Sequence, residues 1–204
     1  QYERAIEDYS RAIEINPQYV LPYNGRGNAY RNLRQYERAI EDYSRAIEIN
    51  PQYVLPYNGR GNAYRNLRQY ERAIEDYSRA IEINPQYAVA YRNRGISYYD
   101  LGQYERAIED YDQAILIDPQ YAAAYNSRGL VYEQLEDFER ALREYNQAIL
   151  IASDFAVAIA NRGVAYRRLG RFDEAIADLR RALTLNSDLD WAEEELAQSS
   201  RGIH

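Results

Sequence analysis

The stretch QYERAIEDYSRAIEINPQYVLPYNGRGNAYRNLR at residues 1–34 decides the fold, because it recurs letter for letter at residues 35–68. Residues 69–87 repeat its first part once more before the copies diverge. Looser copies follow, and the aromatic residue of the same motif returns every 34 residues, at Tyr2, Tyr36, Tyr70, Tyr104, Phe138 and Phe172. A fixed period of this length predicts an array of repeated units rather than one globular core.

Each period predicts a pair of helices. One helix shows apolar residues at the spacing of a single helix face, namely Ala39, Ile40, Tyr43, Ala46 and Ile47. This helix is expected to end near Asn50, because Pro51 cannot continue its hydrogen bonds. Another helix is expected from Val54 through Leu67, since Pro56 is tolerated in a first helical turn. In the repeat frame below, this helix is the first of its repeat and the helix with Ala39 is a second helix. Glycines and alanines at facing positions are expected to let helix backbones approach closely, while tyrosines fill the larger gaps.

This frame predicts one continuous array over residues 1–204. It begins with the second helix of a repeat at residues 1–19, without its first helix, and ends with a capping helix at residues 190–204. The polar residues Glu193, Glu194 and Glu195 are typical of a cap, which such arrays need for solubility. Five full repeats lie between these ends, at residues 20–53, 54–87, 88–121, 122–155 and 156–189.

The third full repeat carries a family resemblance. Its succession of aromatic, small and proline residues resembles the tetratricopeptide repeat signature: Tyr91, Gly95, Tyr98, Gly102, Tyr104, Ala107, Tyr111, Ala114 and Pro119. The resemblance covers the whole chain, since equivalent glycines recur at Gly27, Gly61, Gly95, Gly129 and Gly163. It implies an all-α, right-handed superhelical α-solenoid of stacked antiparallel helix pairs. It also implies a protein–protein interaction scaffold or adaptor that binds a peptide or partner segment in its concave groove.

Composition disfavours several other functions. The net charge is −7, so nucleic acid, which is a polyanion, is a poor partner. No run of about 18 apolar residues is present to span a membrane. With no targeting signal in this stretch of sequence, a cytoplasmic location is the default expectation.

Catalysis is also disfavoured. The chain has no cysteine and no lysine to act as a nucleophile, and its one histidine is His204 at the C-terminus. No metal-ligand spacing and no phosphate-binding glycine loop is present. We therefore expect no enzyme activity and no cofactor.

Two recurring residue types are expected to have structural roles. Most of the 23 tyrosines lie at signature packing positions. An arginine precedes each signature glycine, and its stem is expected to pack while its guanidinium reaches a carboxylate on a neighbouring helix. These arginines are Arg26, Arg60, Arg94, Arg128 and Arg162.

Asparagines on the first helices are the candidate binding residues. Asparagine is a poor helix residue, so three on one face impose a cost that folding alone does not explain. A side-chain amide can pair with the backbone of an extended peptide without reading its side chains. The resemblance places these residues in the groove, although exact duplication would copy them even into a merely solvated groove. They are Asn24, Asn28 and Asn32, repeated as Asn58, Asn62 and Asn66.

The same face is expected to become more apolar in the later repeats. Ile96, Leu130 and Val164 would form a shallow hydrophobic strip there. Arg92, Tyr99 and Asn126 complete the predicted groove residues. The familiar tetratricopeptide clamp for a terminal carboxylate is a poor match, because it needs lysines and arginines beside asparagine. Asn24 and Asn28 could supply the amides, but the chain has no lysine and the matching positions are leucine, glycine or asparagine.

A second hypothesis is that the chain is a structural array, natural or engineered, with no evolved ligand. Letter-perfect copies are typical of recent duplication or of deliberate concatenation. The N-terminal helix at residues 1–19 has an apolar stripe that no preceding helix covers, formed by Ala5, Ile6, Tyr9, Ala12 and Ile13. Head-to-tail self-association through such a stripe extends into filaments.

Overall fold

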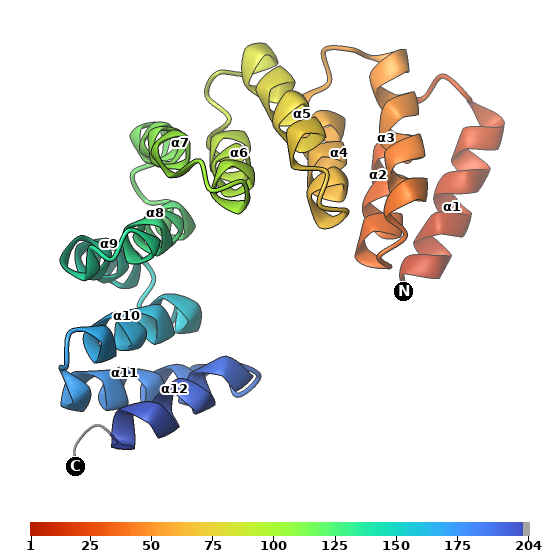
Figure 1. The fold of residues 1–204 in the computed structure, drawn as a ribbon. Coiled ribbons are helices and arrows are strands. Elements are labelled where there is room, and N and C mark those ends of the chain that lie inside the picture. Colours follow the sequence, from red (N-terminus) through yellow and green to blue (C-terminus); the bar gives the residue numbers. More distant parts are fainter. Residues whose placement is uncertain (202–204) are drawn as a thin grey trace. The chain divides into compact units, whose positions relative to one another are not determined.

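The computed structural model describes residues 1–201 as twelve α-helices with no strand among them (Figure 1). His204 and the last residues of the predicted cap lie outside the described residues. This all-α architecture of consecutively packed helices confirms the predicted fold class. The helices are α1 (Tyr2–Ile15), α2 (Val20–Asn32), α3 (Tyr36–Ile49), α4 (Val54–Asn66), α5 (Tyr70–Ile83), α6 (Ala88–Asp100), α7 (Tyr104–Ile117), α8 (Ala122–Gln134), α9 (Phe138–Ile151), α10 (Ala156–Arg168), α11 (Phe172–Leu185) and α12 (Asp190–Arg201).

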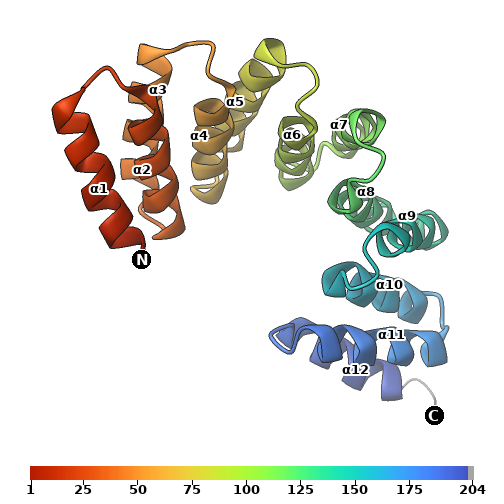
Figure 2. The same ribbon diagram turned by 180° about the vertical axis from the view of Figure 1, so that it is seen from behind.

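The chain divides into two compact units, Gln1–Arg106 and the remainder from Ala107 onward. In unit 1, α2 packs on α3 and α4 on α5, and α3 also contacts α4. In unit 2, α8 packs on α9 and α10 on α11, and α12 covers α11. Figure 2 shows these neighbours from behind. Stacked helix pairs therefore build each unit, whereas a single array over residues 1–204 stays a prediction.

Asparagines and prolines end the second helices. The Oδ1 atom of Asn50 accepts a hydrogen bond of 3.0 Å from the backbone N–H of Gln52. This side-chain turn lies where Pro51 stops the helical hydrogen bonds. Asn16, Asn84, Asp118 and Asn186 make the same bond after α1, α5, α7 and α11.

The first helices end on a residue in the left-handed conformation. The backbone N–H of Gln35 donates to the carbonyl oxygen of Tyr30 over 2.9 Å, and Arg34 between them has a φ of 59°. Glycine usually occupies this position, and it does so at Gly102 and Gly170. A side chain in this conformation costs about 1 kcal/mol relative to glycine. Arg34, Arg68 and Glu136 bear that cost.

A tyrosine of α3, α5 and α9 fills the space beside the signature glycine, and Leu179 of α11 takes that place beside Gly163. Tyr43 of α3 is 0% exposed. A Cβ atom at Gly27 of α2 would lie 2.8 Å from the Cε1 atom of Tyr43, and one at Gly59 of α4 would lie 2.7 Å from it. The glycines thus make room for a tyrosine ring between successive first helices. The expectation that they serve the approach of two backbones was incomplete, because the ring occupies that space.

Helices α1 and α3 have the same sequence but different surroundings. Helix α3 lies against both α2 and α4, and four of its side chains are buried. Helix α1 contacts α2, and none of its side chains is buried. Because the sequences are identical, the difference in burial shows how much of a second helix the preceding first helix covers.

Arginine bridges join three helices at a time. The Nη2 and Nε atoms of Arg60 in α4 donate to Asp76 of α5 over 2.7 and 2.9 Å. Its Nη1 atom donates to Ser44 of α3 over 2.9 Å. Burial raises the pKa of the Asp76 carboxyl, and Arg60 opposes that rise. The predicted structural role of the recurring arginines is thereby confirmed.

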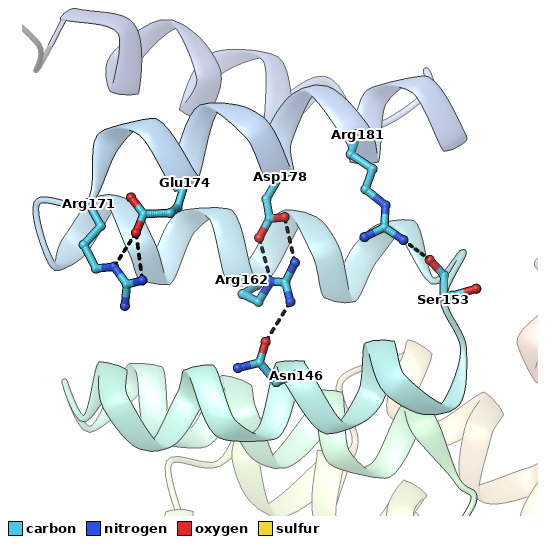
Figure 3. Close-up of polar contacts among 7 residues, drawn as sticks. All are labelled: Asn146, Ser153, Arg162, Arg171, Glu174, Asp178 and Arg181. Carbon is cyan, nitrogen blue, oxygen red and sulfur yellow. Dashed lines mark hydrogen bonds and ion pairs between the residues drawn. The ribbon is translucent and has the colours of Figure 1, made fainter.

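Figure 3 shows the same bridge in unit 2. Arg162 of α10 reaches up to Asp178 of α11 with Nε at 2.6 Å and Nη2 at 2.8 Å. Its Nη1 atom reaches down to Asn146 of α9 over 2.7 Å. The bridge therefore holds a helix pair together and also attaches it to the preceding second helix.

We expect Arg60→Ala to lower the free energy of unfolding by about 3 kcal/mol, because it leaves the buried Asp76 without its cation. Arg79→Ala is the matched control, because Arg79 pairs with the exposed Glu82. It is expected to change stability little. Urea unfolding followed by circular dichroism measures both, and equal losses for the two variants would contradict the bridge as described.

Candidate functional site

The six asparagines predicted from the early repeats lie on α2 and α4, which contact each other in unit 1. Asn32 and Asn66 are exposed, and the other four are half-buried. All six amides are therefore accessible at least in part. Their hydrogen bonds nevertheless divide them into different groups.

Asn28 and Asn62 serve the packing tyrosines. The hydroxyl of Tyr43 donates to Oδ1 of Asn28 over 2.7 Å, and that of Tyr77 donates to Oδ1 of Asn62 over 2.9 Å. Burial raises the pKa of Tyr43 to about 12, so the hydroxyl stays a neutral donor. A buried tyrosine hydroxyl needs a hydrogen-bond partner. The recurrence of a packing tyrosine with an asparagine in each early repeat could have indicated this pairing, which was not predicted. Each of these amides keeps its N–H groups for other partners.

Two asparagines pair with the next repeat. Oδ1 of Asn58 accepts a hydrogen bond of 2.9 Å from Nδ2 of Asn93. Oδ1 of Asn126 accepts one of the same length from Nδ2 of Asn161. Asn126 is only 6% exposed, so its amide lies within the packing between repeats.

Asn66 donates from Nδ2 to the backbone carbonyl oxygen of Asn62 over 2.7 Å. Folding therefore explains several of the predicted asparagines, and the argument that it could not was wrong. Asn24 and Asn32 are different, since within residues 1–201 neither side chain forms a hydrogen bond. Their amides are the ones most available to a ligand.

The later predicted groove residues are less uniform. In unit 1, Arg92, Ile96 and Tyr99 are half-buried, and the Tyr99 ring lies 5.7 Å from the Tyr104 ring between centroids. In unit 2, Leu130 is half-buried and Val164 is 7% exposed. A hydrophobic strip through both units stays a prediction, and Val164 contributes mainly to packing.

Two hollows in unit 1 are lined by all the early asparagines except Asn58. The apolar hollow has a volume of about 420 Å³ and is lined by Tyr9, Ala12, Tyr19, Leu21, Pro22, Asn24, Gly25, Asn28 and Tyr53. The arginine hollow has a volume of about 380 Å³ and is lined by Arg31, Asn32, Arg34, Tyr36, Asn62, Arg65 and Asn66. One hollow thus offers amides beside apolar surface, and the other offers amides beside cations.

Unit 2 has a smaller hollow of about 190 Å³, the glutamate hollow, lined by Glu133, Gln134, Glu136, Phe138 and Arg168. Burial raises the pKa of Glu133, although a hydrogen bond of 2.8 Å from the Tyr145 hydroxyl opposes the rise. None of the three hollows was predicted from the sequence. One sequence feature could have pointed to the arginine hollow: residues 20–34 contain three arginines and no carboxylate.

The described residues offer little for other chemistry. Within residues 1–201, no three histidine, aspartate or glutamate side chains are grouped so as to hold a metal ion. None of the helices in that range combines the length and the apolar character that a membrane crossing requires. What the surface offers is hydrogen-bonding amides, arginines and shallow hollows.

Family comparisons agree with the repeat pattern. A model described as a TPR repeat matches residues 1–34, 61–102 and 97–136. Models described as a tetratricopeptide repeat match residues 20–53, 43–75, 122–155 and 156–189. The chain belongs to the tetratricopeptide repeat family. None of these models describes a catalytic domain, and no curated protein sequence matches this tetratricopeptide repeat chain.

Solved structures share the tetratricopeptide fold. A chain of the APC/C hetero-tetramer Cut9–Hcn1 is 18% identical with a TM-score of 0.86, and the match covers 97% of this chain but 39% of that one. YrrB, titled a TPR protein with an unusual peptide-binding site, is 22% identical with a TM-score of 0.65 over 93% of this chain and 97% of its own. TTC0263, a thermophilic TPR protein in Thermus thermophilus, is 23% identical with a TM-score of 0.76, and the match covers 90% and 100% of the two chains. At these identities the likeness shows the fold alone.

Proposed function

We propose that this tetratricopeptide repeat chain is an adaptor whose first helices hold an extended segment of a partner protein. The observation that carries the proposal is the state of Asn24 and Asn32. Their amides are accessible and form no hydrogen bond within residues 1–201, and each lines a hollow. An unpaired amide supplies both a donor and an acceptor to a peptide backbone.

Neighbouring groups support the same role. The N–H groups of Asn28 and Asn62 stay available, because their tyrosine partners occupy the oxygen atoms. Leu21 and Tyr19 are exposed beside Asn24 and offer apolar contacts to alternate side chains. The solved structure of YrrB is titled as that of a TPR protein with a peptide-binding site, and we carry that role to this chain as part of the proposal.

The self-associating array is the second candidate, and the uncovered face of α1 favours it. Ile15 of α1 is 85% exposed, whereas Ile49 at the same position of α3 is half-buried. Helix α1 contacts α2 as α3 contacts α4, so the face that α2 covers on α3 is the one left open on α1. A second copy of the chain that covers this face would produce head-to-tail association.

Peptides selected on the full chain from a phage-displayed library test the adaptor proposal. We expect Asn24→Ala combined with Asn32→Ala to weaken binding of the selected peptides at least fivefold, because a lost hydrogen bond is worth about 1 kcal/mol. Fluorescence anisotropy measures the affinity. Gln113→Ala combined with Gln198→Ala is the control, since it removes two exposed amides from other helices. Equal affinity for the wild type and the asparagine variant would refute the assignment.

Sedimentation velocity over a range of concentrations tests the second candidate. If α1 mediates association, the mass should rise with concentration, and Ile15→Glu should suppress the rise by placing a charge on the open face. Leu150→Glu is the control, because Leu150 is 77% exposed on another helix. A monomer at every concentration would eliminate this candidate.

A further inference from the structure

Charge is divided unevenly between the two helices of each early repeat. Residues 20–34 carry three arginines and no carboxylate, whereas residues 35–50 carry two arginines and four carboxylates. The identical copies repeat this division at residues 54–68 and 69–84. A chain with a net charge of −7 thus presents a local surplus of positive charge on its early first helices.

Part of that surplus positive charge lines the arginine hollow. Arg31, Arg34 and Arg65 line it, and no carboxylate does. Within residues 1–201, none of these three guanidinium groups forms a hydrogen bond or an ion pair. Asn32 and Asn62 add amide N–H donors to the same hollow. Three unpaired cations with neighbouring donors form a site that lacks only an anion.

The backbone at Arg34 is left-handed. Its φ of 59° is the conformation that glycine adopts at Gly102 and Gly170. Arg34 therefore occupies a position where a side chain is disfavoured, and that side chain lines the hollow. Arg68 and Glu136 have the same conformation, so the strain is common to these turns, and what distinguishes Arg34 is that its side chain lines the arginine hollow.

The corresponding hollow in unit 2 has the opposite charge. At the repeat positions of Arg31 and Arg34 it has Glu133 and Glu136, while Phe138 replaces Tyr36. Arg167, at the position of Arg65, is paired with Glu195 over 2.6 Å. The repeat fold by itself therefore does not produce a cationic hollow, and the early side chains do.

Asp100 of α6 is a carboxylate close enough to Arg65 to feel its charge. Burial raises the pKa of Asp100, and the nearby charges of Arg65 and Arg68 oppose the rise. The charge of Arg65 is therefore felt by Asp100 as well as in the hollow, although the two residues form no ion pair. Neither Arg31 nor Arg34 forms an ion pair within residues 1–201, so both can contribute charge to the hollow.

We propose that the arginine hollow binds an oxyanion, a carboxylate or a phosphate, on a side chain of the partner segment. Guanidinium groups match such oxygens in pairs of parallel hydrogen bonds. The hollow lies at the C-terminal ends of α2 and α4, whereas the terminal-carboxylate clamp considered from the sequence would involve Asn24 and Asn28. The identity of the partner rests on the proposed function, but binding of the oxyanion itself does not.

The full chain is titrated with three small probes, and the Nε–Hε resonances of its arginines are followed by NMR. The probes are the N-acetyl, N-methylamide derivatives of phosphoserine, glutamate and glutamine. We expect saturable shifts of Arg31 and Arg34 with the two anions, at dissociation constants on the order of 1 mM, and none with glutamine. Tighter binding of phosphoserine assigns a phosphate, and equal or tighter binding of glutamate assigns a carboxylate. Equal shifts with glutamine, or none with either anion, would overturn the site.

Two glycine variants separate binding from stability. Arg34→Gly should weaken anion binding at least fivefold and raise the urea midpoint, because it removes the guanidinium and the strain together. Arg68→Gly relieves the same strain outside the hollow, so it should raise the midpoint and leave anion affinity unchanged. Wild-type affinity in Arg34→Gly, or an equal loss in Arg68→Gly, contradicts the inference.

The two proposals fail in different ways. If peptide binding depends on Asn24 and Asn32 while the anions do not bind, only the oxyanion site is overturned. If the anions bind while selected peptides ignore those asparagines, the groove assignment is overturned and the oxyanion site stands.

Discussion

The stacking of the early repeats depends on a tyrosine held between two glycines. Tyr43 is fully buried, and its ring fills the space that a Cβ atom at Gly27 or Gly59 would enter. The ring thereby links the first helix of its own repeat to the first helix of the next. Its hydroxyl donates to Asn28, so the same contact also fixes a side chain of the candidate groove. Packing and site are therefore coupled through one residue.

Some polar groups of the first helices are bonded within the fold, and others are left available to a ligand. Tyrosine hydroxyls and neighbouring amides donate to the side-chain oxygens of Asn28, Asn58, Asn62 and Asn126. Arginine bridges such as the one at Arg60 pair with the buried aspartates. Among residues 1–201, no fully buried side-chain nitrogen or oxygen lacks a hydrogen-bond partner. The unpaired amides and guanidinium groups on the first helices of unit 1 lie at the surface, where a ligand can reach them. Their availability does not weaken the core.

The sequence was sufficient for the helices and the family because apolar spacing, glycines and prolines are local signals that recur every 34 residues. It was also sufficient for the arginine bridges, since a cation beside a packing glycine has few partners other than a buried carboxylate. It was insufficient for the asparagines, because whether Asn58 is free depends on Asn93 in the next repeat. The arginine hollow was missed for the same reason, as Arg31 and Arg65 come together only when α2 and α4 stack.

Alanine substitution of the same tyrosine in two identical helices tests the central contact most directly. Tyr9 of α1 is half-buried, and Tyr43 of α3 is fully buried. We predict that Tyr43→Ala lowers the free energy of unfolding in urea by about 3–5 kcal/mol, as expected for a large side chain removed from a packed core. Tyr9→Ala should lower it by less than half as much. Equal losses would show that the tyrosine held between two glycines does not join the repeats.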